Sequence, residues 1–214
     1  MMKNIICIFM FMLLLTGLTN AEYSSEKLKK GIRLGFNQST VTNADFDVKN
    51  YTGYCIGGFL NYQSSEYFSL QMELLYNGKG YRQENVISRD SNGVAVGTID
   101  EVTTILSYIE IPIIAKITAI PNGKYRPYVL GGGFIGLLVQ DKLRLSNSAP
   151  FLDVDIENSK SSDVGFLFGG GIDLKAGEKT WMFFEVRYEI SLISPIQNVD
   201  YKSRSLGFQT GLWF

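Results

Sequence analysis

The chain has 214 residues, of which 45% are hydrophobic, 13% aromatic and 19% charged, and its formal net charge is −1 at pH 7. It contains no histidine, which excludes Ser-His-Asp and Cys-His catalysis, histidine metal sites and imidazole acid–base chemistry. The charge balance shows no basic excess, so we expect no nucleic-acid partner.

The first 21 residues have the three regions of a secretory signal peptide. Lys3 supplies a positive charge, Ile5–Leu15 form an apolar run, and small residues end at Ala21. A membrane anchor is the alternative, but the apolar run is shorter than the roughly 18 residues that a spanning helix needs. We therefore predict a signal peptide over residues 1–21, cleavage near Ala21, and a single domain over residues 22–214.

The rest of the chain alternates between apolar and polar residues, which is the period of a β-strand. The pattern predicts eight strands, which in chain order cover about Gly31–Gln38, Gly53–Tyr62, Tyr67–Tyr81, Thr104–Thr118, Arg126–Gln140, Asp163–Ala176, Thr180–Leu192 and Ser205–Phe214. In the third strand, for example, Leu70 and Met72 share one face while Gln71 and Glu73 share the other. The fifth strand is almost equally apolar on both faces, so either face of it can point inward.

The connections between these strands alternate between short and long. Short turns are predicted near Gln63–Glu66, Ile120–Lys124 and Gly177–Lys179, and long polar connections near Ser39–Thr52, Arg82–Thr103, Asp141–Ser162 and Ile193–Arg204. Outer-membrane barrels have this layout, with short periplasmic turns at one end and long extracellular loops at the other. The sequence therefore predicts an all-β fold, an eight-stranded antiparallel up-and-down transmembrane β-barrel.

The faces opposite the apolar ones distinguish a membrane barrel from a soluble barrel or sandwich. A soluble β-protein would have many charged residues there, but these faces carry mainly Gly, Ser, Asn and Gln with a few charges of both signs. Small residues fit the narrow interior of an eight-stranded barrel, and charges buried in it have to pair. We predict that the apolar faces contact lipid and that one inward ion network includes Arg33, Glu73, Glu110, Lys116, Glu185, Arg187 and Glu189, with Asp173 and Lys175 on the same faces.

Aromatic residues gather near both ends of the predicted strands. The group near the short turns is Tyr62, Tyr67, Phe68, Tyr125, Tyr128, Trp181 and Phe214, and the group near the long connections is Tyr51, Tyr54, Tyr76, Tyr81, Tyr188 and Tyr201. Two such groups indicate the aromatic girdles of a membrane barrel. Ordinary enrichment of Tyr and Phe in strands is the alternative explanation.

Several stretches of the chain resemble the PorT-like outer-membrane β-barrel family. They are GIRLGFN (31–37), FSLQMELLYNGKG (68–80), YIEIPIIAKI (108–117), RPYVLGGGFIG (126–136) and the closing strand that ends at Phe214. The resemblance implies an eight-stranded barrel in a Gram-negative outer membrane, in a family whose named member is linked to protein secretion. The ending Leu212-Trp213-Phe214 is similar to the C-terminal aromatic signature that the barrel-assembly machinery reads, so Phe214 is the predicted assembly signal.

Two other patterns have weaker interpretations. Gly131–Gly136 matches G-x-G-x-x-G, but a dinucleotide site needs a following helix, and crowded backbone inside a small barrel is the preferred explanation. The acidic group Asp153, Asp155 and Glu157 carries oxygen ligands suited to Ca²⁺ but lacks calcium-loop spacing, so a solvated loop is preferred.

The expected protein is a monomeric, non-enzymatic outer-membrane barrel without a cofactor or metal, with a structural or binding role through its extracellular loops or periplasmic turns. Its expected partners are outer-membrane lipid and, during biogenesis, the barrel-assembly machinery. A component of protein secretion or transport, a small pore and a lipid-modifying enzyme remain alternatives. Glu185 and Glu189 could suggest acid–base chemistry, but pairing with Arg187 is the preferred interpretation, and the lack of histidine counts against an enzyme.

Overall fold

The computed structural model describes residues 27–42, 47–89, 95–145, 153–154, 160–195 and 201–214. The predicted signal peptide and the cleavage near Ala21 lie outside these residues. The strands are β1 (Leu28–Thr42), β2 (Val48–Gln63), β3 (Phe68–Arg89), β4 (Ala95–Thr118), β5 (Tyr125–Leu145), β6 (Asp153–Val154), β7 (Ser162–Lys175), β8 (Trp181–Ser191) and β9 (Lys202–Trp213). No helix among these residues is long and apolar enough to cross a membrane.

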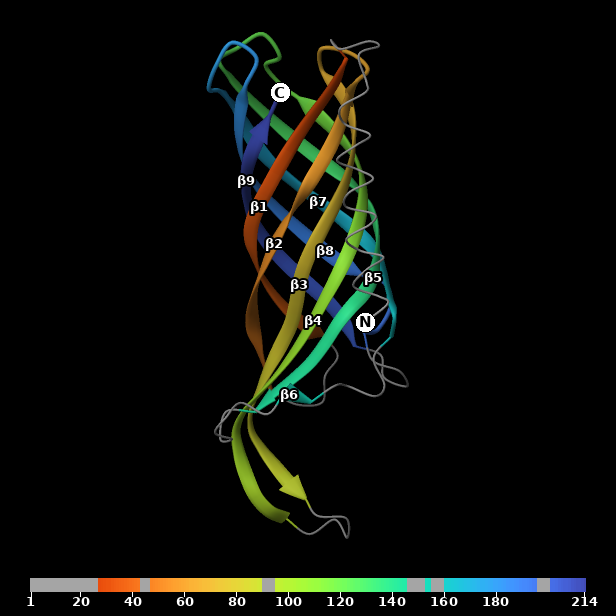
Figure 1. Ribbon diagram of the computed structural model, residues 1–214, viewed down its shortest axis with the longest axis vertical. Helices are drawn as coiled ribbons and strands as arrows, with labels where there is room; N and C mark the ends of the chain where they lie inside the picture. The colour runs from red at the N-terminus through yellow and green to blue at the C-terminus, as the bar shows by residue number, and fades with distance from the viewer. Residues whose placement is uncertain (1–26, 43–46, 90–94, 146–152, 155–159, 196–200) are drawn as a thin grey trace.

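Eight long strands close into an antiparallel up-and-down barrel (Figure 1). β9 returns to pair with β1 in a register that runs from Gly31 opposite Trp213 to Thr42 opposite Lys202. The last residue continues this seam, because the Phe214 amide donates to the Lys30 carbonyl at 2.9 Å and the Lys30 amide donates back at 3.1 Å. The predicted fold class is therefore confirmed. The ninth strand, β6, was not predicted; it has only two residues and pairs with β5 at one rim of the barrel.

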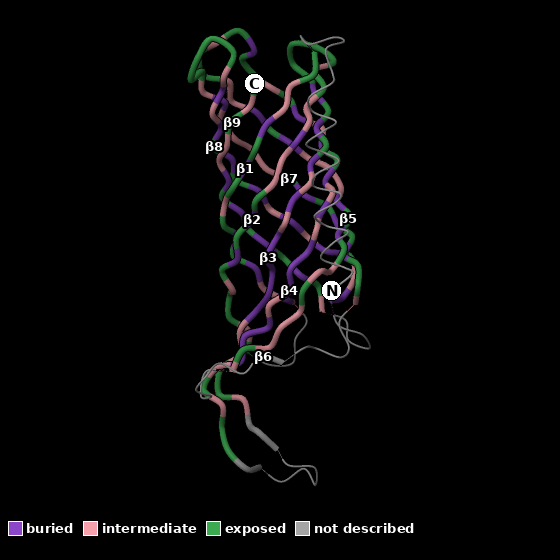
Figure 2. Tube along the Cα trace, in the orientation of Figure 1, coloured by how far each residue is buried: buried purple, intermediate pink, exposed green. Residues whose placement is uncertain are grey.

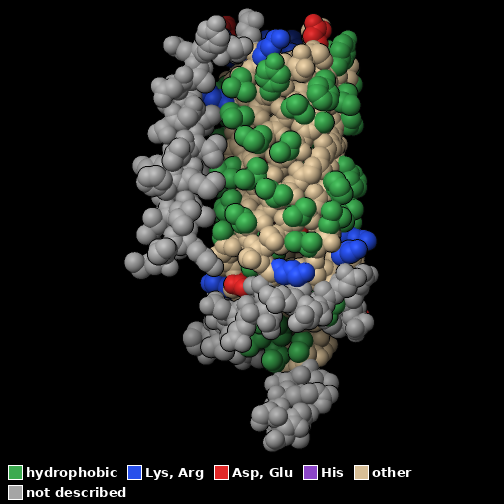
Figure 3. Space-filling view, turned by 90° about the vertical axis from the view of Figure 1, so that its right-hand side faces the viewer, with side chains coloured by type: hydrophobic (Ala, Val, Ile, Leu, Met, Phe, Trp, Pro, Cys, Tyr) green, Lys and Arg blue, Asp and Glu red, His purple; other side chains and the backbone are tan. Residues whose placement is uncertain are grey.

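The two faces of each long strand differ sharply in exposure (Figure 2). On β4, Ile113 is 61% exposed while Ile114, the next residue, is 0% exposed. On the face drawn in Figure 3, apolar side chains cover the barrel wall between charged side chains near its two ends. The apolar faces therefore point outward, as a membrane barrel requires.

The inward face of β5, which its sequence left open, is set by its neighbours. Phe134 is 3% exposed and Ile135 is 58% exposed, so the even-numbered residues of this stretch point inward. Its register with β4 places Phe134 opposite Pro112, and Pro112 lies on the inward side of β4. Residues paired directly opposite each other project to the same face of a sheet. The register with β4 therefore determines which face of β5 points inward, although the composition of β5 does not.

The short turns all lie at one end of the barrel, as predicted, and this end is called the short-turn end below. At the other end, the long-loop end, the strands run further than the sequence predicted. β1 reaches Thr42, β3 reaches Arg89, β4 begins at Ala95 and β5 reaches Leu145. The predicted loop Arg82–Thr103 is therefore mostly a β-hairpin. Polarity marks where a strand leaves lipid, but hydrogen bonding between strands continues in water once the register is set.

The predicted aromatic girdles form only in part. At the short-turn end Tyr62, Tyr67 and Tyr125 are exposed on the outside, whereas Tyr128 and Trp181 are buried inside. Tyr81, assigned to the other girdle, is also buried. The inward aromatics stand at positions whose parity faces the lumen, where they fill the interior.

The facing of β9 makes a testable difference between neighbouring substitutions. Phe208 lies outside against Phe36, with ring centroids 5.3 Å apart. We expect Phe208→Arg to lower the free energy of unfolding from bilayers by about 2–4 kcal/mol, because it puts a charge on the lipid face. Urea titration of the barrel in vesicles would measure this. Phe208→Leu is the matched control and should stay within about 1.5 kcal/mol of wild type; equal losses in the two variants would contradict the assigned facing.

Candidate functional site: the ion-paired interior and the two rims

The middle of the interior holds two arginines and two glutamates. Arg187 on β8 donates two hydrogen bonds to Glu73 on β3, both at 2.7 Å, and also pairs with Glu185. Arg33 on β1 lies 3.3 Å from Glu73 and 3.2 Å from Glu185. All four side chains are buried. The group carries two positive and two negative charges, so its formal charges balance inside a medium that penalises unpaired ones.

Two aromatic rings hold Arg33 in place. The guanidinium carbon lies 5.3 Å from the ring centroid of Phe59 and 5.1 Å from that of Phe183, an arrangement that allows cation–π attraction. Glycines make room for both rings, because a Cβ at Gly31 would meet the Phe59 ring and one at Gly211 would meet the Phe183 ring. The sequence thus supplies large and small residues on facing strands so that a charged side chain is packed as tightly as an apolar one.

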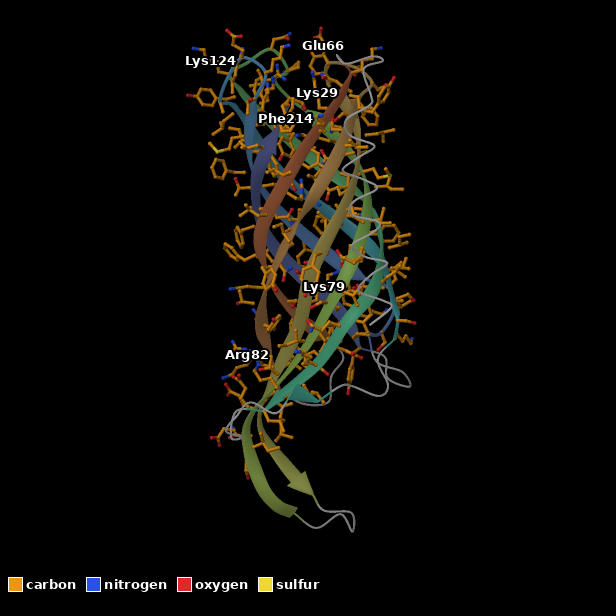
Figure 4. The ribbon with its side chains drawn as sticks, viewed as in Figure 1. Lys29, Glu66, Lys79, Arg82, Lys124 and Phe214 are labelled. Carbon is orange, nitrogen blue, oxygen red and sulfur yellow. The ribbon has the colours of Figure 1, made fainter. Side chains whose placement is uncertain are left out.

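A second group lies nearer the long-loop end and centres on Lys79 of β3 (Figure 4). Its ammonium lies 2.7 Å from Glu110, 3.2 Å from Glu189 and 3.3 Å from Asp163. One cation therefore faces three carboxyl groups. Neutral donors supplement it: Asn77 donates to Glu110 at 2.8 Å, and Ser191 donates to Asp163 at 2.9 Å.

A third group lies at the short-turn end. Lys116 donates to Asp173 at 2.8 Å, and the Trp213 indole donates to the same carboxylate at 3.3 Å. These residues line a recess of about 470 Å³ at the mouth, together with Lys29 and Arg126. The Arg126 guanidinium lies 3.8 Å from the Trp181 ring centroid. The recess offers polar and cationic groups to the space beyond the short turns.

The structure thus divides the predicted single network into three groups. Arg33, Glu73, Glu185 and Arg187 belong to the middle group, Glu110 and Glu189 to the Lys79 group, and Lys116 to the mouth group. The predicted link between Arg187 and Glu189 is not made, since Glu189 faces Lys79 instead. Lys175, which parity placed inside, is exposed because β7 ends there.

Lys79 and Asp163 were the functional residues that the sequence analysis did not count. Both stand at inward positions of their strands, so parity was the signal that would have found them. Asp163 marks the start of a strand and was assigned beside a loop, and Lys79 lies beyond the apolar part of β3 between two glycines. A charged residue near a strand end is hard to distinguish from a solvated one by composition alone.

The β3–β4 hairpin dominates the long-loop rim (Figure 1). β2 pairs with β3 as far as Gln83, and β5 pairs with β4 as far as Val102, but β3 and β4 continue to pair with each other up to Arg89 and Ala95. In the described chain, no strand outside the hairpin pairs with residues 84–89 or 95–100. The hairpin therefore projects beyond the barrel, and neither of its edges pairs with another strand of the described residues.

Ion pairs brace the base of this hairpin. Lys49 on β2 lies 2.5 Å from Glu84, and Arg82 lies 3.4 Å from Glu101. Arg82 also donates to the Asn50 carbonyl at 2.9 Å. Just beyond, Asn85 has a φ of 54°, a left-handed conformation that Asn tolerates better than most residues. The hairpin therefore leaves the barrel at a defined and charged base.

The remaining motifs do not form sites in the described residues. Gly131–Gly136 lies within β5, and no helix follows it. Within the described ranges, no cluster of three or more His, Cys, Asp or Glu side chains is placed to hold a metal ion. The side chains of the acidic group at Asp153, Asp155 and Glu157 lie outside what the structure describes.

The closed barrel, its apolar belt and its ion-paired interior define an outer-membrane β-barrel. Residues 20–197 match the family model described as outer membrane protein beta-barrel domain, and the chain belongs to that family. No curated protein matches the sequence.

Three solved structures with similar folds are distant in sequence. Ail of Yersinia pestis, solved in complex with the heparin analogue sucrose octasulfate, is 16% identical with a TM-score of 0.44, and the match covers 88% of this chain and 99% of Ail. OprG of Pseudomonas aeruginosa is 12% identical with a TM-score of 0.48, covering 86% and 94%. Neisserial surface protein A is 12% identical with a TM-score of 0.45, covering 85% and 95%. At these values nothing about their ligands transfers to this chain.

The division of the interior into groups predicts which buried charges are coupled. We expect Arg187→Met to destabilise the barrel by about 3–5 kcal/mol, because it leaves buried carboxylates without a partner. Adding Glu73→Gln should recover part of this loss, with a coupling energy of about 0.5–3 kcal/mol in a double-mutant cycle measured by urea unfolding.

The matched control is the cycle between Arg187→Met and Glu189→Gln. Glu189 pairs with Lys79, so the two effects should add to within about 0.5 kcal/mol. If Arg187 were coupled as strongly to Glu189 as to Glu73, the interior would be one network rather than separate groups.

Proposed function

We propose that this protein is a monomeric, non-enzymatic outer-membrane barrel that binds an extracellular protein partner through the β3–β4 hairpin. The observation that carries the proposal is the hairpin itself, which continues past the barrel with two edges that no other described strand pairs with. Uncovered edges present backbone donors and acceptors to which an extended segment of another protein can add as a strand. The two ion pairs at its base join the hairpin to β2 and link its own two strands.

The packed interior supports a binding role rather than a pore. Arg33, Phe59 and Phe183 meet across the lumen in the middle of the barrel, and Arg187 fills the space beside them. Leu75 and Ile114 are fully buried in the same interior. Eight strands leave room for little beyond such side chains.

The carboxylates of the interior favour a binding role over an enzymatic one. Glu185 and Glu189, whose spacing suggested acid–base work, each face a cation and are buried. A general acid or base has to reach a substrate proton, and both carboxylates are instead held by cations inside the barrel.

The proposal includes three finer assignments. The barrel follows a signal peptide over residues 1–21, cleaved near Ala21, so that the domain covers residues 22–214. Within its family it is of the PorT-like kind, which keeps a role in protein secretion as the alternative function. Phe214 acts as the C-terminal signal for the barrel-assembly machinery; its ring is exposed on the outside, 5.6 Å from the Lys30 ammonium.

Removing the hairpin tests the binding role. Gln83 and Val102 are directly opposite each other, so an Asn-Gly turn can join them and replace residues 84–101. We expect the shortened barrel to fold with stability close to wild type, since the deleted part of the β3–β4 ladder lies beyond the barrel and the ion pairs that are lost are exposed. A photo-crosslinker at Val86 should capture a partner in native outer membranes, and one at Tyr125 on the opposite end should not. Capture of the same protein from both positions, or unfolding of the shortened barrel, would contradict the proposal.

Planar-bilayer recording tests the filled interior. Purified wild-type protein should give no stable open-channel current above that of detergent alone, because the Arg33–Phe59–Phe183 layer blocks the lumen. Stable single-channel steps would promote the small pore to the leading function.

A further inference from the structure

Two cations stand on the outer face of β9 where the apolar band ends. Lys202 and Arg204 are exposed, whereas the alternate residues Ser203 and Ser205 are buried, so both cations point outward. The next outward residue, Leu206, already belongs to the apolar band. Lys202 and Arg204 have no acidic partner among the described residues, in contrast to Lys49 and Arg82 on the same rim, which pair with Glu84 and Glu101.

Hydroxyl groups of the neighbouring strand border the two cations. The β1–β9 register places Thr40 opposite Arg204 and Thr42 opposite Lys202. Side chains opposite each other lie about 5 Å apart, and the two cations, two residues apart on one strand, are separated by about 7 Å. The Thr42 hydroxyl donates to the Lys202 carbonyl at 3.3 Å. A guanidinium, an ammonium and the Thr40 hydroxyl therefore lie on one patch, which is a donor set suited to phosphate oxygens.

An apolar groove lies on the same side of the barrel, further toward the short-turn end. It has a volume of about 820 Å³ including its open side. Leu34, Phe36, Phe184 and Phe208 form its walls, while Thr210 and Gly170 leave its floor low. The paired rows Phe36–Phe208–Val186–Gly170 and Leu34–Thr210–Phe184–Ile172 show that it crosses β1, β9, β8 and β7.

The spacing between patch and groove matches a membrane lipid. Phe208 is four residues from Arg204 along β9, a distance of about 13 Å in an extended strand. One leaflet contributes about 15 Å of the roughly 30 Å hydrocarbon core. A lipid with its phosphate at Arg204 therefore reaches the groove with its acyl chain.

We propose that the outer face of β1, β8 and β9 binds one phosphorylated, acylated lipid of the outer leaflet, with its phosphate on Lys202 and Arg204 and an acyl chain in the groove at Thr210. A soluble anion would use the patch but not the groove, and a neutral lipid would use the groove but not the patch. The long-loop end faces the outside in barrels of this layout, which places the patch at the level of the outer-leaflet headgroups. The site is independent of the β3–β4 hairpin.

Native mass spectrometry of the purified full-length barrel tests the site. The protein is stripped of lipid in detergent and mixed with a diphosphorylated acylated glycolipid or with the same glycolipid after dephosphorylation. We expect wild-type protein to retain the phosphorylated form about 10- to 30-fold better, since each surface cation strengthens binding to anionic lipid severalfold. The double variant Lys202→Gln/Arg204→Gln should lose this preference.

Two further variants separate the site from general effects. Lys29→Gln/Lys124→Gln removes two cations at the short-turn end (Figure 4) and should keep the wild-type preference. Thr210→Phe raises the groove floor and should weaken retention of the acylated glycolipid while leaving the patch intact. Heat-modifiable gel mobility of each variant verifies that the barrel is folded.

Three results would overturn the proposal. The first is equal retention of the two glycolipid forms by wild-type protein, and the second is unchanged preference in Lys202→Gln/Arg204→Gln. The third is displacement of the glycolipid by inorganic phosphate alone at millimolar concentration, which would make the patch a site for soluble anions.

Discussion

Every peptide group within the hydrocarbon has to find its hydrogen-bond partner inside the protein, and the β1–β9 seam is where this requirement is completed. Lipid offers no substitute for water, so an open sheet edge would cost several kcal/mol for each unpaired group. The seam runs from the Phe214–Lys30 amides to the pairing of Lys202 with Thr42. Closure at eight strands then fixes the width of the interior, and the width determines which side chains the lumen accepts.

Within that width, charge has to be packed as well as paired. Arg33 fits because Phe59 and Phe183 flank it and because Gly31 and Gly211 give way to those rings. Such a buried ion group adds little stability compared with an apolar filling of the same volume. Its contribution lies in orientation: turned outward, each arginine would cost about 2–4 kcal/mol in lipid. The interior charges therefore specify which face of the sheet is the inside, a choice that the apolar residues alone leave weaker.

The predictable part of the structure is the part that this solvent constraint governs. The alternation of Ile113 and Ile114 shows why: with one face in lipid and one in a polar lumen, period and composition both report the facing. The inward face of β5 could not be predicted because its glycines and apolar residues suit either face. Only its register with β4 determines which residues point inward. The full length of β3 and β4 could not be predicted for another reason. Beyond Gln83 the hairpin stands outside the membrane, where the polarity of its residues does not distinguish a strand from a loop. The grouping of the ions escaped because parity tells which residues face inward but not at what height, and height depends on the stagger between strands.

The difference between the interior and the rim indicates where this barrel can bind other molecules. Inside, Arg33, Lys79, Lys116 and Arg187 are paired with carboxylates, and Lys79 alone faces Glu110, Asp163 and Glu189. At the rim the commitments differ between strands: Arg82 and Lys49 brace the hairpin, while Lys202 and Arg204 face outward without an acidic partner in the described chain. An uncommitted cation at the edge of an apolar band lies near anionic headgroups whether or not a specific lipid is held. The groove at Thr210 adds specificity to this electrostatic attraction, because only a ligand that carries both a phosphate and an acyl chain can occupy the patch and the groove together.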